Sequence, residues 1–422
     1  MTQLGITKTL FFIALIGGFC LIASMMVLGL VSEREGRFAD AKREIASGWS
    51  ERQTLAGPML IIPGSDPKED FTTFVLPKTL TVKSTLVPEV RSRGIFHAVV
   101  YTSEVEVSGT FSRTELRSIA AGKPVTLGVL LTDTKGIEAA IPLEWDGASA
   151  AFAPGPGLAV DRSSGFHAVV SAGKGDADIP FSFVFSVKGS EGISVAPLGD
   201  ETSVTVTSPW PSPKFSGEFL PVDRSITAEG FTATWKISSF GRSYPGTWKE
   251  GDVSFDRVLS SVAGVDLYET LDPYDPVVRS IKYAVLFIVM SFAAFFLFDV
   301  RSGVRIHPVS YLLVGAALAL FYLLLLSLTE QIGFAPAYLI AALLTVSLVS
   351  GYSAAMLRDG KRAIPVALLL SLLYGYLYFV LQLEDYALLF GAFLLFAFLA
   401  FLMFATRKID WFELDGRGRS AE

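Results

Sequence analysis

Six long apolar runs constrain this chain more than any other feature of its sequence. The first run, residues 10–31, holds 22 consecutive residues without a charged side chain. Five more runs follow after residue 280, at approximately 281–298, 309–328, 338–357, 363–381 and 386–405. A helix needs about 20 residues to cross the hydrocarbon core of a bilayer. The sequence therefore predicts a membrane protein with six transmembrane helices, one N-terminal and five in a C-terminal bundle.

The first run is predicted to be an uncleaved anchor. A cleavable signal peptide has a shorter apolar core, about 7–15 residues, followed by a site of small residues. The lone cysteine, Cys20, lies inside the run and follows Phe19, where a lipoprotein cleavage site requires a small residue. Cys20 is therefore expected to be a buried helix residue. With one cysteine, no intrachain disulfide can stabilise an exported domain.

Residues 32–280 have a different character, with many short segments of alternating polarity. FSFVFSV (181–187), FTATWKI (231–237), SVTVT (203–207) and AVVYTSEVEV (98–107) all follow a period of two. This period is typical of strands with one buried face. Gly, Pro and Ser clusters separate the segments, which favours a large domain resembling a β-sandwich.

Two further segments of this region carry structural expectations. Phe38, Ala41, Ile45 and Trp49 are spaced as one helical stripe, which predicts that the first helix continues beyond its apolar run. This continuation is interpreted as a linker helix, with docking on the domain or at its surface as the alternative. The segment SPWPSPKFSGEFLP (208–221) is rich in proline, which lacks a backbone donor and cannot continue a central strand. It is interpreted as a rigid corner, with Trp210, Phe215 and Phe219 capping the core.

Charge in the short loops predicts the orientation. The loops at 299–307 and 358–362 and the tail after 406 carry Lys and Arg, whereas TEQIGFAP and QLEDY carry none. By the positive-inside rule the basic loops are cytoplasmic. Both termini are then cytoplasmic and residues 32–280 are periplasmic. The charges that flank the first helix, Lys8 before it and four basic residues after it, argue for the opposite orientation. The five later helices agree with one another and outweigh it.

Chemistry-bearing motifs are sparse. The sequence contains no HExxH, CxxC, GxSxG or P-loop pattern, and His97, His167 and His307 lie far apart. Acidic residues are interpreted as solvated surface (Asp66, Asp70, Glu104 and Glu106) or as loop residues between helices (Glu330 and Glu384). We predict no catalytic, cofactor-binding or metal-binding residue. A net charge of −6 argues against a nucleic-acid partner.

Within the apolar runs no ionisable residue takes a central position, so a packed helical bundle is favoured over an ion pathway. The pairs Gly315/Ala319 and Ser347/Gly351 have the four-residue spacing of close helix packing. At the start of the bundle, Arg279, Lys282 and Tyr283 are expected to anchor the chain at the membrane surface.

Several stretches in order resemble the CreD family of bacterial inner-membrane proteins, also called cell envelope integrity proteins. They are QTLAGPML (53–60), RSRGIF (91–96), SPWPSPKFSGEFLP, DPYDPVVRSIKYAVLFI (272–288) and RIHPVSYLLVGAALALFYLLLLSLTEQIGF (305–334). The resemblance covers nearly the whole chain. It implies an inner-membrane location, a periplasmic domain, expression under a two-component system, and a link to envelope integrity and colicin tolerance. It assigns no catalytic or binding residue.

The expected organisation is an N-terminal anchor (1–31), a periplasmic β-rich domain (32–280), a five-helix bundle (281–406) and a cytoplasmic tail (407–422). The leading hypothesis is a non-enzymatic protein that supports or senses envelope integrity by binding another envelope protein or a lipid, with the bilayer itself as a partner. One alternative is a carrier or exporter of a hydrophobic envelope component. The other is an enzyme acting on an envelope polymer.

Overall fold

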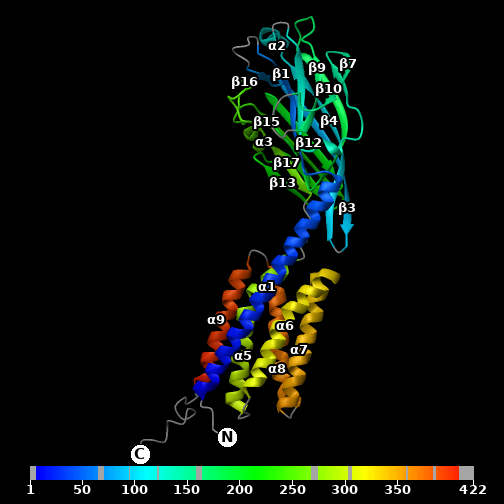
Figure 1. The fold of residues 1–422 in the computed structure, drawn as a ribbon. Coiled ribbons are helices and arrows are strands. Elements are labelled where there is room, and N and C mark those ends of the chain that lie inside the picture. The colour runs from blue at the N-terminus through cyan, green and yellow to red at the C-terminus, as the bar shows by residue number, and fades with distance from the viewer. Residues whose placement is uncertain are drawn as a thin grey trace, which may run out of the picture. The chain divides into compact units, whose positions relative to one another are not determined.

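The computed structural model describes residues 6–64, 71–94, 96–120, 123–157, 164–267, 274–302, 307–357, 360–383 and 386–407. The chain forms two compact units (Figure 1). The helical unit comprises Met1–Phe38 and Leu271–Glu422, and the β unit comprises Ala39–Thr270. The residue at which the units divide lies inside one continuous helix.

That helix, α1 (Ile6–Trp49), has 44 residues and a length of roughly 66 Å at 1.5 Å per residue. Its continuation past residue 31 confirms the prediction made from the stripe of Phe38, Ala41, Ile45 and Trp49. At its C-terminal end, within the β unit, the indole N–H of Trp49 donates to the Tyr101 carbonyl at 3.1 Å.

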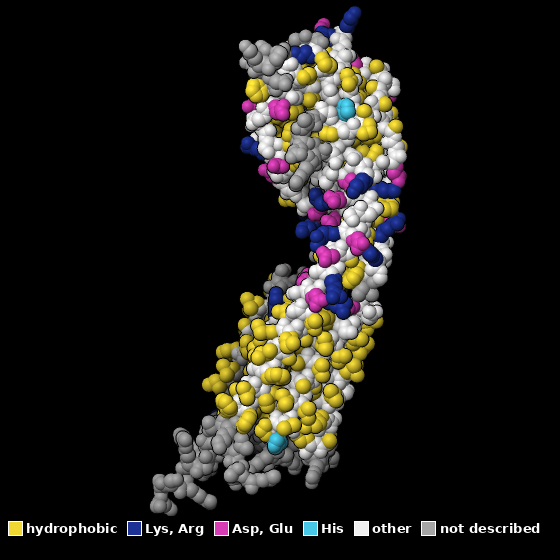
Figure 2. Space-filling view, in the orientation of Figure 1, with side chains coloured by type: hydrophobic (Ala, Val, Ile, Leu, Met, Phe, Trp, Pro, Cys, Tyr) yellow, Lys and Arg dark blue, Asp and Glu magenta, His cyan; other side chains and the backbone are white. Residues whose placement is uncertain are grey.

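In the described part of the helical unit there are six further helices: α4 (Asp275–Lys282), α5 (Ala284–Ser302), α6 (Pro308–Ile332), α7 (Phe334–Leu357), α8 (Gly360–Gln382) and α9 (Ala387–Thr406). Among the described residues, α1, α6, α7, α8 and α9 are each long and apolar enough to span a membrane. Figure 2 shows apolar side chains gathered over this unit.

The predicted span at 281–298 is not a single straight helix. Its first two residues, Ile281 and Lys282, belong to α4, and the rest from Ala284 belongs to α5. The axes of the two helices differ by 42° across a break at Tyr283. In the described chain, five of the six predicted spans are therefore single helices. The bent pair of α4 and α5 supplies the sixth span if the pair is counted as one. The first member, α4, carries Arg279 and Lys282 in its last turn, and it buries Val277 and Ile281.

The β unit contains two mixed sheets in the described part of the chain. The nine-stranded sheet has the order β13-β17-β11-β1-β5-β9-β8, with β2 on β1 and β16 on β2. Its strands are β1 (Gln53–Ile62), β2 (Thr73–Val75), β5 (Val125–Leu131), β8 (Ala153–Pro154), β9 (Ser164–Val170), β11 (Gly192–Val195), β13 (Pro213–Gly217), β16 (Thr247–Lys249) and β17 (Ala263–Leu267).

The eight-stranded sheet has the order β14-β15-β12-β3-β4-β10-β6-β7. Its strands are β3 (Thr79–Arg93), β4 (Phe96–Phe111), β6 (Pro142–Trp145), β7 (Ala148–Ala151), β10 (Ile179–Ser190), β12 (Glu201–Ser208), β14 (Asp223–Thr227) and β15 (Gly230–Ser238). Short helices α2 (Arg113–Ala120), η1 (Thr134–Gly136) and α3 (Phe255–Ser260) join strands of this unit.

The two sheets share one apolar core. On β10, Phe181, Phe183, Phe185 and Val187 are buried and alternate with more exposed residues, as the FSFVFSV pattern predicts. The ring of Phe166 on β9 lies 6.1 Å from the ring of Phe183 and 5.4 Å from that of Phe185. Because β9 and β10 belong to different sheets, these contacts join the two layers, and the sandwich-like prediction is confirmed.

The segment 208–221 takes the chain from one sheet to the other. Trp210, Phe215 and Phe219 pack against the core, as predicted. The segment is more than a corner, however, because Pro213 begins β13, an edge strand that pairs with β17. Proline is tolerated there since its missing donor lies on a sheet edge.

Candidate functional site

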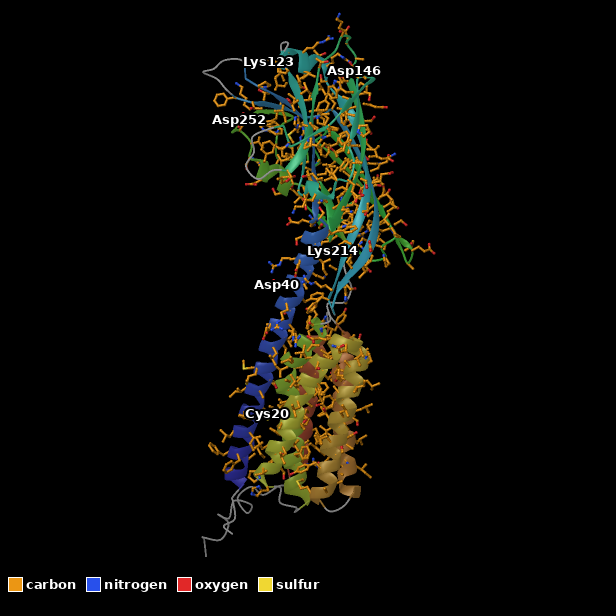
Figure 3. The ribbon with its side chains drawn as sticks, turned by 45° about the vertical axis from the view of Figure 1, so that its right-hand side comes forward. Cys20, Asp40, Lys123, Asp146, Lys214 and Asp252 are labelled. Atoms are coloured by element: carbon orange, nitrogen blue, oxygen red, sulfur yellow. The ribbon has the colours of Figure 1, made fainter. Side chains whose placement is uncertain are left out.

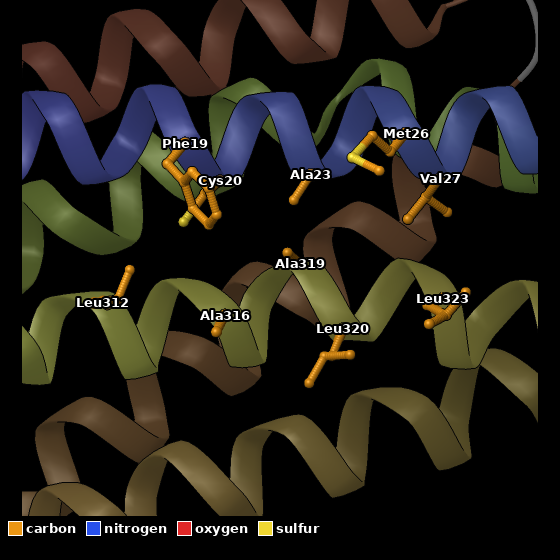
Figure 4. Close-up of a pocket in the computed structure, with 10 residues that line it drawn as sticks. All are labelled: Phe19, Cys20, Ala23, Met26, Val27, Leu312, Ala316, Ala319, Leu320 and Leu323. Carbon is orange, nitrogen blue, oxygen red and sulfur yellow. The ribbon is translucent and has the colours of Figure 1, made fainter.

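An apolar groove lies between α1 and α6 in the helical unit (Figure 4). Its volume is about 380 Å³ and all ten lining residues are apolar. Ala23 and Val27 contribute from α1, and Ala316, Ala319 and Leu323 contribute from α6. A hydrocarbon wall with small side chains along it suits an apolar ligand, because no polar group needs to be satisfied.

The close approach of α1 and α6 depends on Gly315. A Cβ atom at this position would collide with the Sγ of Cys20 and lie 2.8 Å from the ring of Phe292 on α5. Cys20 is buried on α1, as expected from the sequence (Figure 3). Gly315 is therefore a close-packing position, as predicted, whereas its partner Ala319 lines the groove. The second predicted pair is not a close-packing pair, because Gly351 is exposed and nothing lies within 4 Å of the position of a Cβ there.

A polar cluster lies further along the same two helices. Arg34 on α1 and Glu330 on α6 form an ion pair, with Nε and Oε1 at 3.7 Å. The Tyr274 hydroxyl donates to the same carboxylate at 3.1 Å. Phe38 completes the cluster with its ring 6.1 Å from that of Tyr274 in an edge-to-face arrangement.

Glu330 is the functional candidate that the sequence interpretation missed. It was expected in a loop, but it lies in the last turn of α6, which ends at Ile332 and is capped by Gly333 with φ of 78°. Its side chain is only 10% exposed. The signal was present in the sequence, since Gly333 is a typical helix-terminating residue and places Glu330 inside the helix.

Helical spacing aligns the cluster with the groove. Val27 and Arg34 are seven residues apart on α1, and Leu323 and Glu330 are seven residues apart on α6. Seven residues complete almost two turns, so each pair shares a helix face at a separation of roughly 10 Å. The apolar groove therefore leads to an ion pair at one end.

Tyrosine hydroxyls elsewhere in the bundle hold helices together. Tyr338 on α7 donates to the Tyr374 carbonyl at 2.7 Å, and Tyr376 on α8 donates to the Phe390 carbonyl at 2.7 Å. Each hydrogen bond offsets the free-energy cost of burying a tyrosine hydroxyl in the apolar bundle. The role of these tyrosines is therefore to hold neighbouring helices together.

The buried charges of the β unit are structural. Arg113 on α2 makes two bonds to Asp146, at 2.5 and 2.8 Å, and donates to the carbonyls of Ala172 and Ala177. The hydrogen bond from Arg113 holds the pKa of Asp146 below its ordinary value. Arg242 similarly bonds Asp200 at 2.9 Å and the Gly199 carbonyl at 3.0 Å. Beside it, burial raises the pKa of Tyr244 to about 12.

The histidines lie on three separate elements, β4, β9 and the start of α6. His167 Nδ1 is 2.8 Å from the Gly155 carbonyl, and His307 accepts from the Val309 N–H as the N-cap of α6. Among the residues that the structure describes, no group of three or more His, Cys, Asp or Glu could hold a metal ion. Glu104 and Glu106 lie on the exposed face of β4, as predicted. Asp66, Asp70 and Glu384 lie outside the described residues.

The fold and the groove together define a multi-pass membrane protein with a large β unit inserted between its first and second membrane segments. The family model described as "Inner membrane protein CreD" matches residues 6–412. The chain is also 32% identical over 416 residues to Inner membrane protein CreD of Escherichia coli (strain K12), covering 94% of this chain and 91% of that one. This chain belongs to the CreD family of inner membrane proteins.

Among solved structures, the chain is similar to one from Parabacteroides distasonis described as a "putative protease". The TM-score is 0.25 and the identity 13%, over 59% of this chain and 50% of that chain. A similarity this weak carries no argument about the fold or the activity.

Proposed function

We propose that this chain is a non-enzymatic inner-membrane protein that supports or senses envelope integrity by binding a lipid or another envelope protein. The observation that carries the proposal is the α1–α6 groove, an apolar concave surface that leads to the Arg34–Glu330 ion pair. Such a surface suits binding of an amphipathic molecule. Within the described chain, the two buried arginines of the β unit, Arg113 and Arg242, are each bonded to a carboxylate and to backbone carbonyls.

The proposal includes an orientation, with both termini cytoplasmic and residues 32–280 in the periplasm. The distribution of Lys and Arg among the short loops supports it. The β unit then meets envelope components outside the inner membrane.

The experiment compares a bacterial strain lacking this chain with the same strain expressing it at native level. We expect the deletion to raise uptake of a hydrophobic dye and leakage of a periplasmic enzyme, and the full chain to restore both. A second arm places photo-crosslinking residues on exposed positions of the β unit and identifies what they capture. Equal permeability of the two strains, with no crosslinked lipid or protein, would contradict the proposal.

A carrier or exporter of a hydrophobic envelope component is the second candidate, and the groove is the observation that favours it. The groove uses α1 as one wall, so transport would require the first helix as well as the C-terminal bundle. Purified chain in vesicles distinguishes the two functions. A carrier moves a fluorescent lipid between leaflets faster than protein-free vesicles do, whereas a binding protein leaves that rate unchanged.

A further inference from the structure

The groove and Arg34 combine two kinds of surface on one helix face. Phe19, Ala23 and Val27 line the groove on α1, and Arg34 lies on the same face roughly 10 Å beyond Val27. A hydrocarbon surface that ends in a guanidinium group matches a molecule with an apolar chain and an anionic head.

The guanidinium of Arg34 is available to such a head group. Its side chain is 44% exposed, whereas that of Glu330 is 10% exposed. The 3.7 Å contact between them is longer than a hydrogen bond, and Glu330 also accepts from Tyr274. The Glu330 carboxylate is therefore enclosed, while the Arg34 side chain remains partly accessible to a ligand. Arginine bonds phosphate oxygens in pairs through its planar fork of N–H groups.

The charge of Arg34 beyond the apolar groove favours an anionic lipid over an apolar helix as the occupant. The groove residues Phe19 to Val27 extend along roughly 12 Å of α1. An acyl chain needs only this apolar wall, and the phosphate of the same molecule can pair with the Arg34 side chain beyond it. The exposed rings and chains at the rim, such as Phe19, Met26 and Leu320, can close over a narrow chain.

We propose that this surface binds a single phospholipid molecule, with its phosphate on Arg34 and one acyl chain in the α1–α6 groove. The proposal rests on the proposed function, because it specifies a phospholipid as the ligand. It assigns Arg34 the role of head-group contact and the small residues of α6 the role of keeping space for the chain.

The test uses the full chain purified in detergent and native mass spectrometry to count bound molecules. Three probes are added separately: dioleoylphosphatidylglycerol, dioleoylglycerol, which lacks the phosphate, and glycerol 3-phosphate, which lacks the acyl chains. We expect retention of the phospholipid at one per chain and at least tenfold weaker retention of the other two. Equal retention of dioleoylglycerol would exclude Arg34 as a determinant and overturn the proposal.

Two variants separate the two halves of the site. Ala316→Leu fills the groove from an exposed position, and Arg34→Gln removes the charge. Each is expected to weaken phospholipid retention at least tenfold. The matched controls are Ala397→Leu, on the exposed surface of α9, and Arg37→Gln, which loses only an exposed ion pair with Glu33. Both controls are expected to stay within twofold of the parent chain, and thermal unfolding confirms that all four variants fold.

The alternative occupant is a helix of a second polypeptide. If Ala316→Leu abolishes a protein complex and leaves phospholipid retention unchanged, the groove is a helix-binding surface and the proposal fails.

Lipid retention and the permeability of the complemented strain are independent measurements. A chain that retains phospholipid through Arg34 but does not restore the envelope contradicts the proposed function and leaves the lipid site intact.

Discussion

Arg113 shows how a single side chain organises a region of the β unit. It is buried, and it joins α2 to the β6–β7 turn through Asp146 and to the loop after β9 through the Ala172 carbonyl. A buried guanidinium requires such partners, since desolvation of an unpaired charge is costly. The ion pair therefore belongs to the stability of the β unit.

This ion pair gives a pH prediction. Because the folded-state pKa of Asp146 is lowered, its contribution to stability is complete above the ordinary carboxyl pKa, about 3.9, and is lost as pH falls through the lower folded value. Asp146→Asn should lower the melting temperature of the full chain at pH 7 and flatten its decrease in the acid range. Near-UV circular dichroism at several pH values measures both. Asp223→Asn, on the exposed strand β14, is the control, and equal behaviour of the two variants contradicts the prediction.

Phe183 offers a test of the core. Its ring contacts those of Phe152, Phe166 and Phe185, and the side chain is 3% exposed. Phe183→Ala should destabilise the β unit by about 3–5 kcal/mol, through lost burial and the cavity that remains. Val184→Ala, the next residue on the opposite and exposed face, should stay within about 0.5 kcal/mol. Chemical denaturation followed by tryptophan fluorescence measures both, and similar losses would show that the two faces are not distinct.

At the scale of elements, the end of α1 is held by the long hairpin of β3 and β4 together with β10. The Trp49 ring lies 4.2 Å from the Arg91 guanidinium and 4.5 Å from the Lys188 ammonium. One turn earlier, Glu44 pairs with Arg93, and this partner lowers the pKa of the Glu44 carboxyl. The last turns of α1 are therefore part of the β unit and not a free linker.

Trp49→Ala tests this attachment. It removes one hydrogen bond and two cation–π contacts, which together contribute about 1–3 kcal/mol. We expect faster amide hydrogen exchange over residues 39–49, measured by mass spectrometry. Arg43→Gln, which removes only an exposed pair with Asp40, should leave the exchange unchanged. Unchanged exchange in Trp49→Ala would mean that other contacts hold the helix end.

Gly315→Ala tests the approach of α6 to α1. The added methyl group would collide with the Cys20 Sγ, and overpacking of this kind costs about 1–3 kcal/mol. Cys20→Ala should recover part of the loss in a double variant, since it removes the colliding atom. Gly351→Ala, at an open position on α7, is the matched control. Thermal unfolding in detergent measures the parent chain, the two single variants, the double variant and Gly351→Ala, and strictly additive effects of the two single changes would contradict the direct contact.

At the scale of the whole molecule, much of the architecture could be predicted from local patterns. Hydropathy was sufficient to locate the membrane helices, because a span needs an uninterrupted run of predominantly apolar residues. Alternation located β10 and β15, because each residue's face is set by its own position in the strand. The order of strands was not predictable, since β13 joins the nine-stranded sheet through pairing with β17, about 50 residues away.

The candidate site was only partly predictable for the same reason. The Gly315/Ala319 spacing indicated a close contact but could not identify Cys20 as the partner. Glu330 was assigned to a loop because the apolar run ends before this charged residue, although the helix continues to Ile332. The break at Tyr283 directly follows a charged residue, Lys282, but neither Gly nor Pro marks it, so the sequence did not predict a bend there.

Membrane topology is the prediction at this scale. Cys20 is the sole cysteine, so a Cys20→Ala chain accepts single reporters. Ser225→Cys, on the exposed strand β14, should react with a membrane-impermeant maleimide in intact spheroplasts. Arg407→Cys, at the exposed end of α9, should react only after the membrane is opened. The reverse pattern would place the β unit in the cytoplasm.

The length of α1 has a consequence for how the chain is made. The helix is synthesised first, yet its contacts come from strands and helices that are synthesised much later. The Lys188 contact of Trp49 can form only after Lys188 is synthesised. The Gly315 contact of Cys20 requires synthesis of about 300 further residues. At ribosomal rates of about 5–20 residues per second, α1 remains without its α6 partner for roughly 15–60 seconds. During that interval the nascent helix must be stable in the bilayer by its own apolar run, and the membrane lipids are the first neighbours that it meets.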